Sequence, residues 1–597
     1  MASERTSAPP ANARFHSDQL LLELGQHLVD QAILTRDQIE EAKERTRLGG
    51  DTFERILVTE GLVSETQLLR ALSELSGIPF KSLSDYTINP AAFARLPPRA
   101  AFRYRVMPID IRRGSVVIAV GQVPDMQMVD SLSMLLSAPI EWVLCAQSEI
   151  TKSLKHFYGL GLEAVDDIIQ SKAAEVIEIE ETDVSTETAD PGVTRFVNQV
   201  IHEAISMEAT DIHVEPFETQ LRLRYRIDGV LQDIPVPKGI QKLKRSIVSC
   251  IKIMAQMNIA ERRKPHDGRI KVRLGAEEFD LRVSVLPTRF GETVAMRILN
   301  RKAMFIDMEH LGLSEGQFQM LKTMSDLPHG IVLITGPTGS GKTTTLYALL
   351  SRINTHDVKI ITVEDPVEYQ MEGISQIQTN APIGLTFAAI LRSILRHDPD
   401  IILIGEIRDS ETADIAVRSA LTGHLVLSTL HTNDAPSSVT RLVDMGIEPY
   451  LVSSCLEGIV AQRLVRKLCT HCRQETTLSD VIVEEITGMF PDRIGQARFY
   501  KPQGCPECNF TGYRGRIAIF EIMIIDDALR TMIIHQQPAN EIRNAAIRGQ
   551  LITLRQDGME KVLEGMTTAE EVIRVARKLD ASSPALDTPE PAEAPSA

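Results

Sequence analysis

Residues 331–345 read IVLITGPTGSGKTTT, and this stretch decides the fold class of the chain. Its first five residues are apolar or β-branched, which is typical of a buried parallel strand, and the residues after Lys342 have the composition of a helix. Between them stands the pattern GxxxxGK[ST], in the strand–loop–helix context that a phosphate-binding loop requires. The glycines let backbone N–H groups turn toward phosphate, and the N-terminus of the helix adds partial positive charge. The stretch therefore predicts a nucleotide-binding domain of the α/β class.

The loop also predicts which side chains bind the nucleotide. We expect Lys342 to reach the β- and γ-phosphates of ATP and Thr343 to bind a Mg²⁺ ion. The residues predicted to contact the nucleotide from this segment are Gly336, Pro337, Thr338, Gly339, Ser340, Gly341, Lys342, Thr343 and Thr344.

Acidic and imidazole side chains follow the next three predicted strands. The second strand ends in Glu364 and Asp365, the third (DPDIILIGEIRD) in Glu406, and the fourth (GHLVLSTLHTND) in His431. Ligands of open parallel sheets bind at the carboxyl ends of the strands. We therefore expect Asp365 in the Mg²⁺ shell, His431 as a sensor of the γ-phosphate, and either glutamate as the general base for the attacking water. The residues leave the choice between the two glutamates open.

The rest of the chain contains several further domains. A length of 597 residues predicts about four domains. With 43% hydrophobic and 24% charged residues, the composition is ordinary for a soluble globular protein. We find neither a membrane-spanning apolar run nor a signal peptide, and we expect a cytoplasmic protein that reaches the inner membrane through partners. The net charge of −16 argues against nucleic acid as a partner.

An internal duplication stands near the N-terminus. The segments LLLELGQHLVDQAILTRDQIEEAKERTR and DTFERILVTEGLVSETQLLRALSEL superimpose at an offset of 29 residues, so that Leu28 aligns with Leu57. Apolar residues recur at helical spacing in both, which predicts a duplicated helical hairpin. The predicted organisation is a disordered start (1–15), a docking module (16–158, with the hairpins at 20–80 and an α/β part at 83–158), an acidic linker (159–192), a small α+β domain (193–300), the ATPase domain (305–460), a zinc-binding subdomain (461–520), C-terminal helices (521–578) and a disordered tail (579–597).

Four of the seven cysteines form two CxxC pairs. Cys469, Cys472, Cys505 and Cys508 supply soft ligands suited to tetrahedral Zn²⁺. A disulfide or a metal-free cluster is the alternative, and a cytosolic setting favours zinc. The basic segment QRLVRKLC at 462–469 is interpreted as a solvated face, with partner or phosphate contacts as the alternative.

The motifs together resemble those of a known family. GPTGSGKTTTLYA, ITVEDPVEY, LRSILRHDPDIILIGEIRD and TGHLVLSTLHTND are similar to the Walker A, Asp-box, Walker B and His-box motifs of the GspE/PilB secretion-motor ATPases. The resemblance covers about residues 193–578. It implies a RecA-like P-loop core preceded by a small PAS-like α+β domain, in a homohexamer whose ATP sites lie between these two domains. It also implies that Arg282, Arg297, Arg392 and Arg396 contact nucleotide phosphates.

The duplicated hairpins resemble, more weakly, the MshEN domain that binds cyclic di-GMP in some members of the family. The positions that would contact the ligand differ: one copy begins Glu23-Leu24-Gly25 and the other Thr52-Phe53-Glu54, so the leading arginines are missing. Without them the phosphodiester loses its positive partners. We therefore expect a protein-docking module rather than a dinucleotide receptor. The expected partner is the cytoplasmic domain of an inner-membrane platform protein, GspL-like or PilM/PilC-like.

These observations predict a hexameric motor ATPase that drives pseudopilus assembly and protein export in a type II secretion system. A type IVa pilus extension ATPase is the close alternative, because the two branches share all the motifs. A DNA-uptake translocase and a nucleotide switch without hydrolysis are more remote alternatives.

Overall fold

The computed structural model describes residues 18–49, 52–86, 88–158, 191–237, 239–275, 277–300 and 307–576. The two predicted disordered ends and nearly all of the predicted acidic linker lie outside the described residues. The chain divides into two compact units. The first runs to Leu299 and includes Cys469–Cys472 and Gln503–Gly512, and the second contains the remainder.

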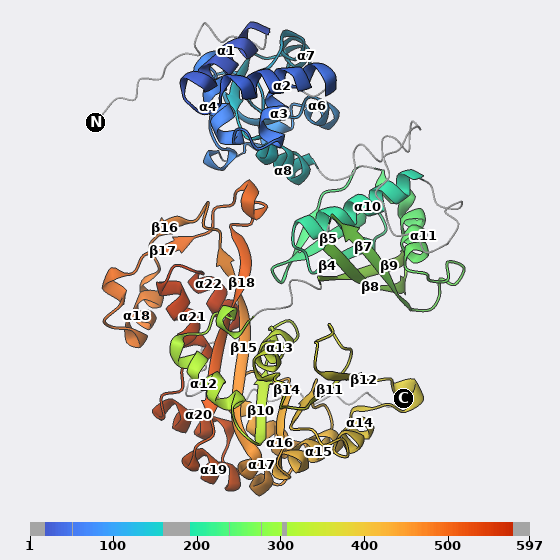
Figure 1. The fold of residues 1–597 in the computed structure, drawn as a ribbon, viewed down its shortest axis with the longest axis vertical. Helices are drawn as coiled ribbons and strands as arrows, with labels where there is room; N and C mark the ends of the chain where they lie inside the picture. The colour runs from blue at the N-terminus through green and yellow to red at the C-terminus, as the bar shows by residue number, and fades with distance from the viewer. Residues whose placement is uncertain are drawn as a thin grey trace, which may run out of the picture. The chain divides into compact units, whose positions relative to one another are not determined.

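The N-terminal module of the first unit combines helical hairpins with a small three-stranded sheet (Figure 1). In the sheet, β2 pairs antiparallel with β1 and parallel with β3. The elements are α1 (Asp18–Asp30), α2 (Arg36–Gly49), α3 (Phe53–Thr59), α4 (Glu65–Ser76), α5 (Pro90–Phe93), α6 (Pro98–Tyr104), β1 (Val106–Arg112), β2 (Ser115–Val120), α7 (Met126–Leu136), β3 (Ile140–Leu144) and α8 (Gln147–Tyr158).

The two hairpins repeat the same backbone pattern. The carbonyl oxygens of Leu28 and Leu57 each accept the N–H five residues later, at 3.0 and 3.1 Å. Ala32 and Gly61, at the matching turn positions, both have a left-handed backbone, with φ of 53° and 69°. Leu28 and Leu57 are fully buried in one apolar cluster. The hairpins therefore share a core as well as a sequence.

A second domain of the first unit, from residue 191, has a six-stranded sheet in the order β6-β5-β4-β9-β8-β7. Its elements are α10 (Pro191–Ser206), β4 (Asp211–Pro216), β5 (Leu221–Ile227), β6 (Val230–Ile234), α11 (Lys244–Met254), β7 (His266–Leu274), β8 (Glu277–Thr288) and β9 (Gly291–Asn300). Alternate residues of each strand point to opposite faces. Leu223, Leu281 and Met296 are buried in the cluster that includes the apolar sides of α10 and α11. The other face is polar and carries the arginines of β5, β8 and β9.

The second unit is built on a seven-stranded sheet in the order β12-β11-β13-β14-β10-β15-β18. All neighbours are parallel except β15 and β18, which are antiparallel. The strands are β10 (Gly330–Thr335), β11 (Ile360–Glu364), β12 (Ser375–Gln378), β13 (Ile401–Ile404), β14 (Leu425–Leu430), β15 (Leu456–Leu468) and β18 (Tyr513–Ile524).

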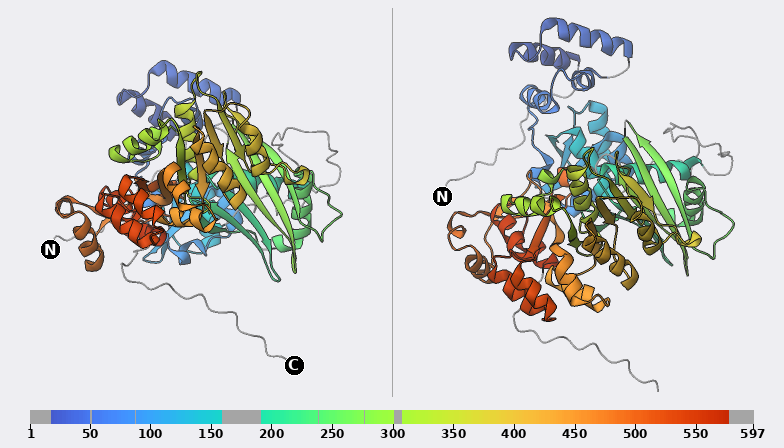
Figure 2. Two further views of the ribbon diagram at one scale, coloured as in Figure 1. Left: turned by 90° about the horizontal axis from the view of Figure 1, so that it is seen from below. Right: turned by 60° about the horizontal axis from the view of Figure 1, so that its bottom comes forward.

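Helices cover both faces of this sheet. Along β10, Ile331 and Leu333 belong to one apolar cluster while Val332 and Ile334 belong to another. The C-terminal helices α19 to α22, drawn in red, lie next to one another (Figure 1 and Figure 2). The helices and the remaining strands are α12 (Glu315–Ser325), α13 (Lys342–Ile353), α14 (Phe387–Ile394), α15 (Ser410–Leu421), α16 (Pro436–Asp444), α17 (Pro449–Cys455), β16 (Gln474–Thr476), α18 (Asp480–Met489), β17 (Phe499–Lys501), α19 (Asp527–Ile534), α20 (Ala539–Arg548), α21 (Leu554–Leu563) and α22 (Ala569–Val575).

Candidate functional site

The phosphate-binding loop joins the end of β10 to the start of α13. Its glycines allow it to lie directly against β15. Gly341 has a φ of 91°, and a Cβ atom there would lie 2.7 Å from Nε2 of Gln462. A Cβ atom on Gly336 would lie 2.6 Å from the carbonyl oxygen of Gln462. Any side chain at these two positions would therefore push the loop off the neighbouring strand.

Two polar groups of the loop are prepared for an anion. Lys342 is 9% exposed, and its Nζ donates to the carbonyl oxygens of Gly336 and Pro337 at 2.7 and 3.1 Å. Burial lowers the pKa of Lys342 to about 8. The hydroxyl of Ser340 is buried and has no hydrogen-bond partner among the described residues. A buried hydroxyl without an acceptor is costly, and a buried ammonium whose acceptors are neutral carbonyls gains from an anion, so both groups fit the phosphates of a nucleotide.

Oxygen ligands for Mg²⁺ are available at the same edge of the sheet. Thr343 lies in the first turn of α13 with its side chain exposed, and Asp365 directly follows β11 and is also exposed. Hydroxyl and carboxylate oxygens are ligands that Mg²⁺ prefers. These two residues fit the ion in type and in position along the chain.

Glu364, at the end of β11, is enclosed rather than open to a ligand. It is 4% exposed. One carboxylate oxygen accepts the phenol O–H of Tyr347, and the other accepts the hydroxyl of Thr362 at 2.5 Å and the amide of Gln376 at 3.2 Å. Burial and the nearby carboxylate raise the pKa of Tyr347, so the phenol keeps its proton and acts as the donor. The carboxylate of Glu364 is thus fully engaged by protein donors.

Glu406 and His431 meet at the ends of adjacent parallel strands, β13 and β14. Nε2 of His431 lies 3.2 Å from one carboxylate oxygen of Glu406, and Arg408 forms an ion pair with the other at 2.5 Å. The charge of Glu406 raises the pKa of Lys342 against the effect of burial, so the carboxylate lies within electrostatic reach of the loop. The structure therefore brings Lys342, Glu406 and His431 together.

Two of the predicted phosphate-binding arginines lie on α14 or just after it, and they contact neighbouring helical residues. Arg392 forms an ion pair with Glu411 of α15. Arg396 donates to the carbonyl oxygen of Arg392 at 2.6 Å and to the hydroxyl of Ser393 at 3.2 Å. Their role at the nucleotide remains a prediction.

The other two predicted arginines lie in the first unit, on the polar face of the six-stranded sheet. Arg282 is on β8 and half-buried. Arg297 is on β9, its side chain is 59% exposed, and it forms an ion pair with Asp211 at 3.0 Å. Asp211 also lies 3.5 Å from the guanidinium of Arg226. The contact of Arg282 and Arg297 with nucleotide likewise stays a prediction.

The structure adds residues that motif reasoning missed. Tyr347, on α13, and Gln376 enclose Glu364; Tyr347 falls within the quoted segment GPTGSGKTTTLYA but outside its GxxxxGK[ST] pattern, and Gln376 falls in no motif. Gln462 and Arg463 are 2% and 8% exposed, so interpreting all of QRLVRKLC as a solvated face is wrong for these two residues. The available signal was a pair of polar residues inside the otherwise apolar run GIVAQRLV, which indicates buried polar groups with a specific purpose.

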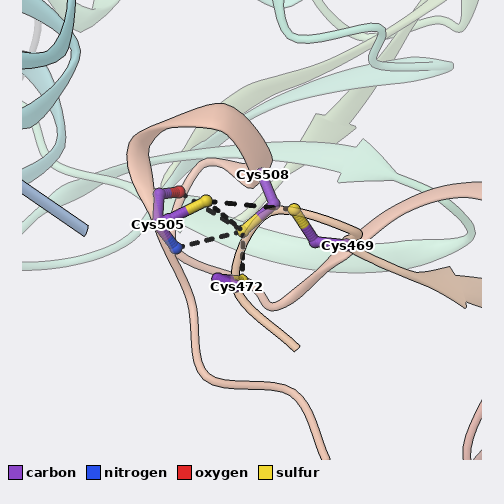
Figure 3. Close-up of side chains that lie close together, drawn as sticks. All are labelled: Cys469, Cys472, Cys505 and Cys508. Atoms are coloured by element: carbon purple, nitrogen blue, oxygen red, sulfur yellow. Dashed lines mark hydrogen bonds between the residues drawn. The ribbon is translucent and has the colours of Figure 1, made fainter. Parts of the chain in front are cut away.

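The four cysteines of the CxxC pairs lie together and are buried (Figure 3). The Sγ–Sγ distances are 3.9 Å for Cys469–Cys505, 3.8 Å for Cys472–Cys508 and 3.7 Å for Cys505–Cys508. Ligands at about 2.3 Å from a tetrahedral Zn²⁺ lie about 3.8 Å apart, so the cluster fits the ion. Disulfide bonds are excluded, because all four thiols are free.

Backbone groups and mutual contacts also prepare this cluster for a cation. The N–H groups of Gly504 and Gly512 donate to Cys472 and Cys508 at 3.3 and 3.2 Å. The hydrogen bond with Cys505 lowers the pKa of the Cys508 thiol, whereas burial raises the pKa of the Cys472 thiol. A thiolate is the form that binds metal.

Within the described ranges, no helix is long and apolar enough to cross a membrane.

Comparison with known proteins gives matches over most of the chain. A family model described as "Type II/IV secretion system protein" matches residues 186–574. The chain is 43% identical over 556 residues to the type IV pilus assembly ATPase PilB of Myxococcus xanthus, covering 92% of this chain and 98% of that protein. It is also 43% identical over 522 residues to the type II secretion system protein E of Xanthomonas campestris pv. campestris, covering 86% and 91%. Among solved structures, the pilus retraction motor PilT with bound ADP has a TM-score of 0.44 at 27% identity, covering 64% of this chain and 96% of that one.

A second family model, the MshEN domain, matches residues 76–164. The match begins at the last residue of α4. It therefore covers the sheet-containing half of the N-terminal module, and not the duplicated hairpins at 20–80, where the motif comparison places the resemblance.

Proposed function

The chain belongs to the Type II/IV secretion system protein family, and we propose that it is a hexameric motor that couples ATP hydrolysis to the assembly of pilin-like filaments. Members of this family are ATPases, and the phosphate-binding loop of this chain serves that activity. Because its relatives include both secretion and pilus ATPases, the chain is a secretion or pilus ATPase. Within that class we assign it to a type II secretion system, with type IVa pilus extension as the alternative.

One observation carries the mechanism: the contact between Glu406 and His431 beside the phosphate-binding loop. A general base must be within reach of the water and must not be consumed by other bonds. Glu406 meets this condition, because its contacts are the imidazole of His431 and the largely exposed Arg408. Glu364 does not, since it is only 4% exposed and three enclosed protein donors hold its oxygens, whereas the two partners of Glu406 are exposed side chains that can move aside. Glu406 is therefore the general base, and His431 holds its carboxylate in place.

The loop residues bind and orient the nucleotide. The Nζ group of Lys342 exchanges the carbonyl oxygens of Gly336 and Pro337 for phosphate oxygens, which compensate its charge better. The buried hydroxyl of Ser340 then gains an acceptor. Thr343 and Asp365 would hold Mg²⁺, and the ion would neutralise charge on the phosphates.

Arginines complete the site from another domain. A phosphoryl transition state gains from a guanidinium that arrives only in the closed state. Arg282 and Arg297 are suited to this task, because they lie on the polar face of their sheet and not in its core. In a hexamer these arginines act on the nucleotide of a neighbouring subunit, so hydrolysis depends on formation of the hexamer.

The cysteine cluster and the N-terminal module have supporting roles. Zn²⁺ bound by four cysteines leaves no open coordination position, so the site is structural. The N-terminal module docks on the cytoplasmic domain of an inner-membrane platform protein, GspL-like in a secretion system or PilM/PilC-like in a pilus system.

The test measures ATPase rate against protein concentration while light scattering follows the oligomer mass. We expect the specific activity to rise as hexamers form. Glu406→Gln should lower kcat by at least about 100-fold and leave ADP binding intact, because a general base contributes on that order. Asp414→Asn, which alters an exposed ion pair with Arg418 on α15, is the matched control and should remain active. Full activity in the monomer, or in Glu406→Gln, would contradict the proposal.

A genetic test separates the two branches. The gene is introduced into one strain that lacks its type II secretion ATPase and into another that lacks its pilus extension ATPase. Our assignment predicts restored export in the first strain and no pili in the second. The reverse result would move the protein to the pilus branch.

A further inference from the structure

Two buried polar residues interrupt β15 beside the phosphate-binding loop. Ala461 pairs with Thr335, the last residue of β10. Gln462 and Arg463 therefore continue β15 just beyond the point where β10 turns into the loop. Gln462 accepts the hydroxyl of Thr345, in the first turn of α13, at 2.8 Å.

The guanidinium of Arg463 joins two parts of the nucleotide site. It donates to the carbonyl oxygen of Gln462 at 2.9 Å and to that of Asn433 at 2.7 Å. Asn433 stands two residues after His431. A Cβ atom on Gly336 would lie 3.0 Å from Nη1 of Arg463, so the guanidinium packs against the first glycine of the loop.

Arg463 is a buried cation that forms no direct ion pair with a carboxylate of the described residues. It is 8% exposed, and in the part of the chain that the structure describes no carboxylate lies within 4.0 Å of its nitrogens. The nearest acidic groups have other partners: Asp434 pairs with Arg543 at 2.6 Å, and Glu521 accepts the N–H of Ala435 at 2.8 Å. Burial lowers the pKa of Arg463, and the charges of Asp434 and Glu521 offset part of that effect.

Two half-buried arginines of the second unit, with side chains 18% and 11% exposed, form ion pairs. Arg543 has Asp434, and Arg555 has Glu485. Leaving a buried charge uncompensated costs folding free energy. The groups beside Arg463 are those of a phosphate-binding loop, so a phosphate bound there would give the guanidinium the direct anionic partner that the described residues do not supply.

We propose that Arg463 is a positioning residue of the nucleotide site, whose counter-charge is the phosphate of the nucleotide bound by the same subunit. It holds Gly336 and the segment after His431 in place through the two carbonyl oxygens. Its charge adds to that of Lys342 when the phosphates arrive. The inference rests on nucleotide binding at this loop and is independent of the hexamer and of the system that the motor serves.

The test compares Arg463→Gln and Arg463→Lys with the wild-type chain. Gln removes the charge but keeps an N–H donor for the carbonyl oxygens, whereas Lys keeps the charge. Arg530→Gln is the matched control, because Arg530 is partly buried and has a carboxylate partner, Glu457, at 2.8 Å. The measurements are the Kd for fluorescent ADP and the Tm of the nucleotide-free protein.

We expect Arg463→Gln to weaken ADP binding by at least about tenfold, as loss of a charge-assisted contact does, without lowering the Tm of the nucleotide-free protein. Arg463→Lys should recover most of the affinity. The control variant Arg530→Gln should have a lower Tm than the wild type and bind ADP with the same affinity. The proposal is overturned if Arg463→Gln binds ADP within twofold of wild type. It is equally overturned if that variant fails to fold or loses as much Tm as the control, since the cation would then serve the fold. Wild-type protein that binds no ADP would instead refute the nucleotide site itself.

Discussion

Glu364 and Glu406 lie at or just beyond the ends of the adjacent strands β11 and β13, and their surroundings separate their roles. For Glu364→Gln we predict a loss of stability of about 1–3 kcal/mol, because the new amide NH₂ group replaces one acceptor oxygen and then faces either the donor Tyr347 or the donors Thr362 and Gln376. Glu406→Gln should melt close to wild type and lose its turnover. Thermal unfolding and kcat, measured on both variants, check this.

Tyr347→Phe provides the control for this prediction. It removes the O–H that donates to Glu364. When Tyr347→Phe is combined with Glu364→Gln, part of the stability lost in Glu364→Gln should therefore return. A Glu364→Gln protein that is as stable as wild type and yet inactive would identify Glu364 as the base.

Lys342 makes nucleotide binding depend on pH. Burial lowers its pKa from 10.5 to about 8 in the nucleotide-free protein, and only the protonated form compensates phosphate. ADP affinity should be constant below pH 8 and fall as the pH rises above it, by up to about tenfold per unit. Folding stability responds in the opposite direction: between about pH 8 and 10.5 the unfolded chain holds more protons at this residue, so its contribution to stability rises with pH.

Titrations with ADP from pH 7 to 9.5 measure this dependence. Lys342→Arg is the control. Its side chain stays charged over this pH range, so the fall in ADP affinity above pH 8 should disappear. An affinity for wild type that does not change over the range would show that Lys342 keeps its ordinary pKa.

Single residues show where sequence reasoning succeeds and where it stops. The motif pattern predicts that Lys342, Glu406 and His431 are near one another, because all three follow parallel strands or their loop. It cannot choose between the glutamates, since the choice depends on contacts of Tyr347 on α13 and Gln376 on β12, and the motif pattern assigns no role to either residue. It also leaves Arg463 within a basic segment, because burial of that side chain depends on β15 pairing with β10 and β18.

At the scale of elements, the cysteine cluster yields a prediction about the metal. Purified protein should contain one Zn²⁺ per chain, and removal of the ion by a chelator should lower the Tm, because four buried thiolates lose their common cation. ADP binding should change little, since the phosphate-binding loop is built by β10 and α13. Elemental analysis and thermal unfolding provide the measurements.

Cys472→Ser should lose the ion, and Cys455→Ser is its matched control. Cys455 is also a buried free cysteine, at the end of α17, but it lies outside the cluster. Loss of zinc from both variants, or a Tm that does not respond to chelation, would contradict a structural zinc site.

Several elements follow directly from sequence pattern. The strand, loop and helix at 330–353 follow from the change from an apolar run through glycines to a helical composition. The repeated hairpins follow from the 29-residue offset, which the matching hydrogen bonds at Leu28 and Leu57 reproduce. β15 is harder to delimit: its alternating apolar residues continue through 460, the predicted end of the ATPase domain, to Leu468, because the antiparallel partner β18 extends the sheet there.

For the whole molecule, composition is a poor guide to the distribution of charge. The chain carries a net charge of −16, yet the polar face of the six-stranded sheet gathers Arg222, Arg224, Arg226, Arg282 and Arg297. The pairing of Arg297 with Asp211 joins residues 86 positions apart and requires β4 to lie beside β9. Local sequence patterns do not contain that strand order, so they predict the arginines and not their common face.

The central claim is that each active site is shared between subunits of a ring. It is tested by mixing Glu406→Gln, which keeps the arginines, with Arg297→Ala, which keeps the base. The two proteins are combined as dilute monomers and then concentrated to form hexamers. Arg222→Gln replaces Arg297→Ala in the control mixture, because Arg222 is on the same sheet and pairs with the exposed Asp233.

The decisive measurement is the ATPase rate of the equimolar mixture of Glu406→Gln and Arg297→Ala, with each variant alone inactive but hexameric. Random assembly gives about a quarter of the interfaces an intact base and an intact arginine from different subunits, so we predict recovery of up to about a quarter of the wild-type rate. A mixture that stays inactive, or an Arg297→Ala protein that is fully active alone, would contradict the shared site.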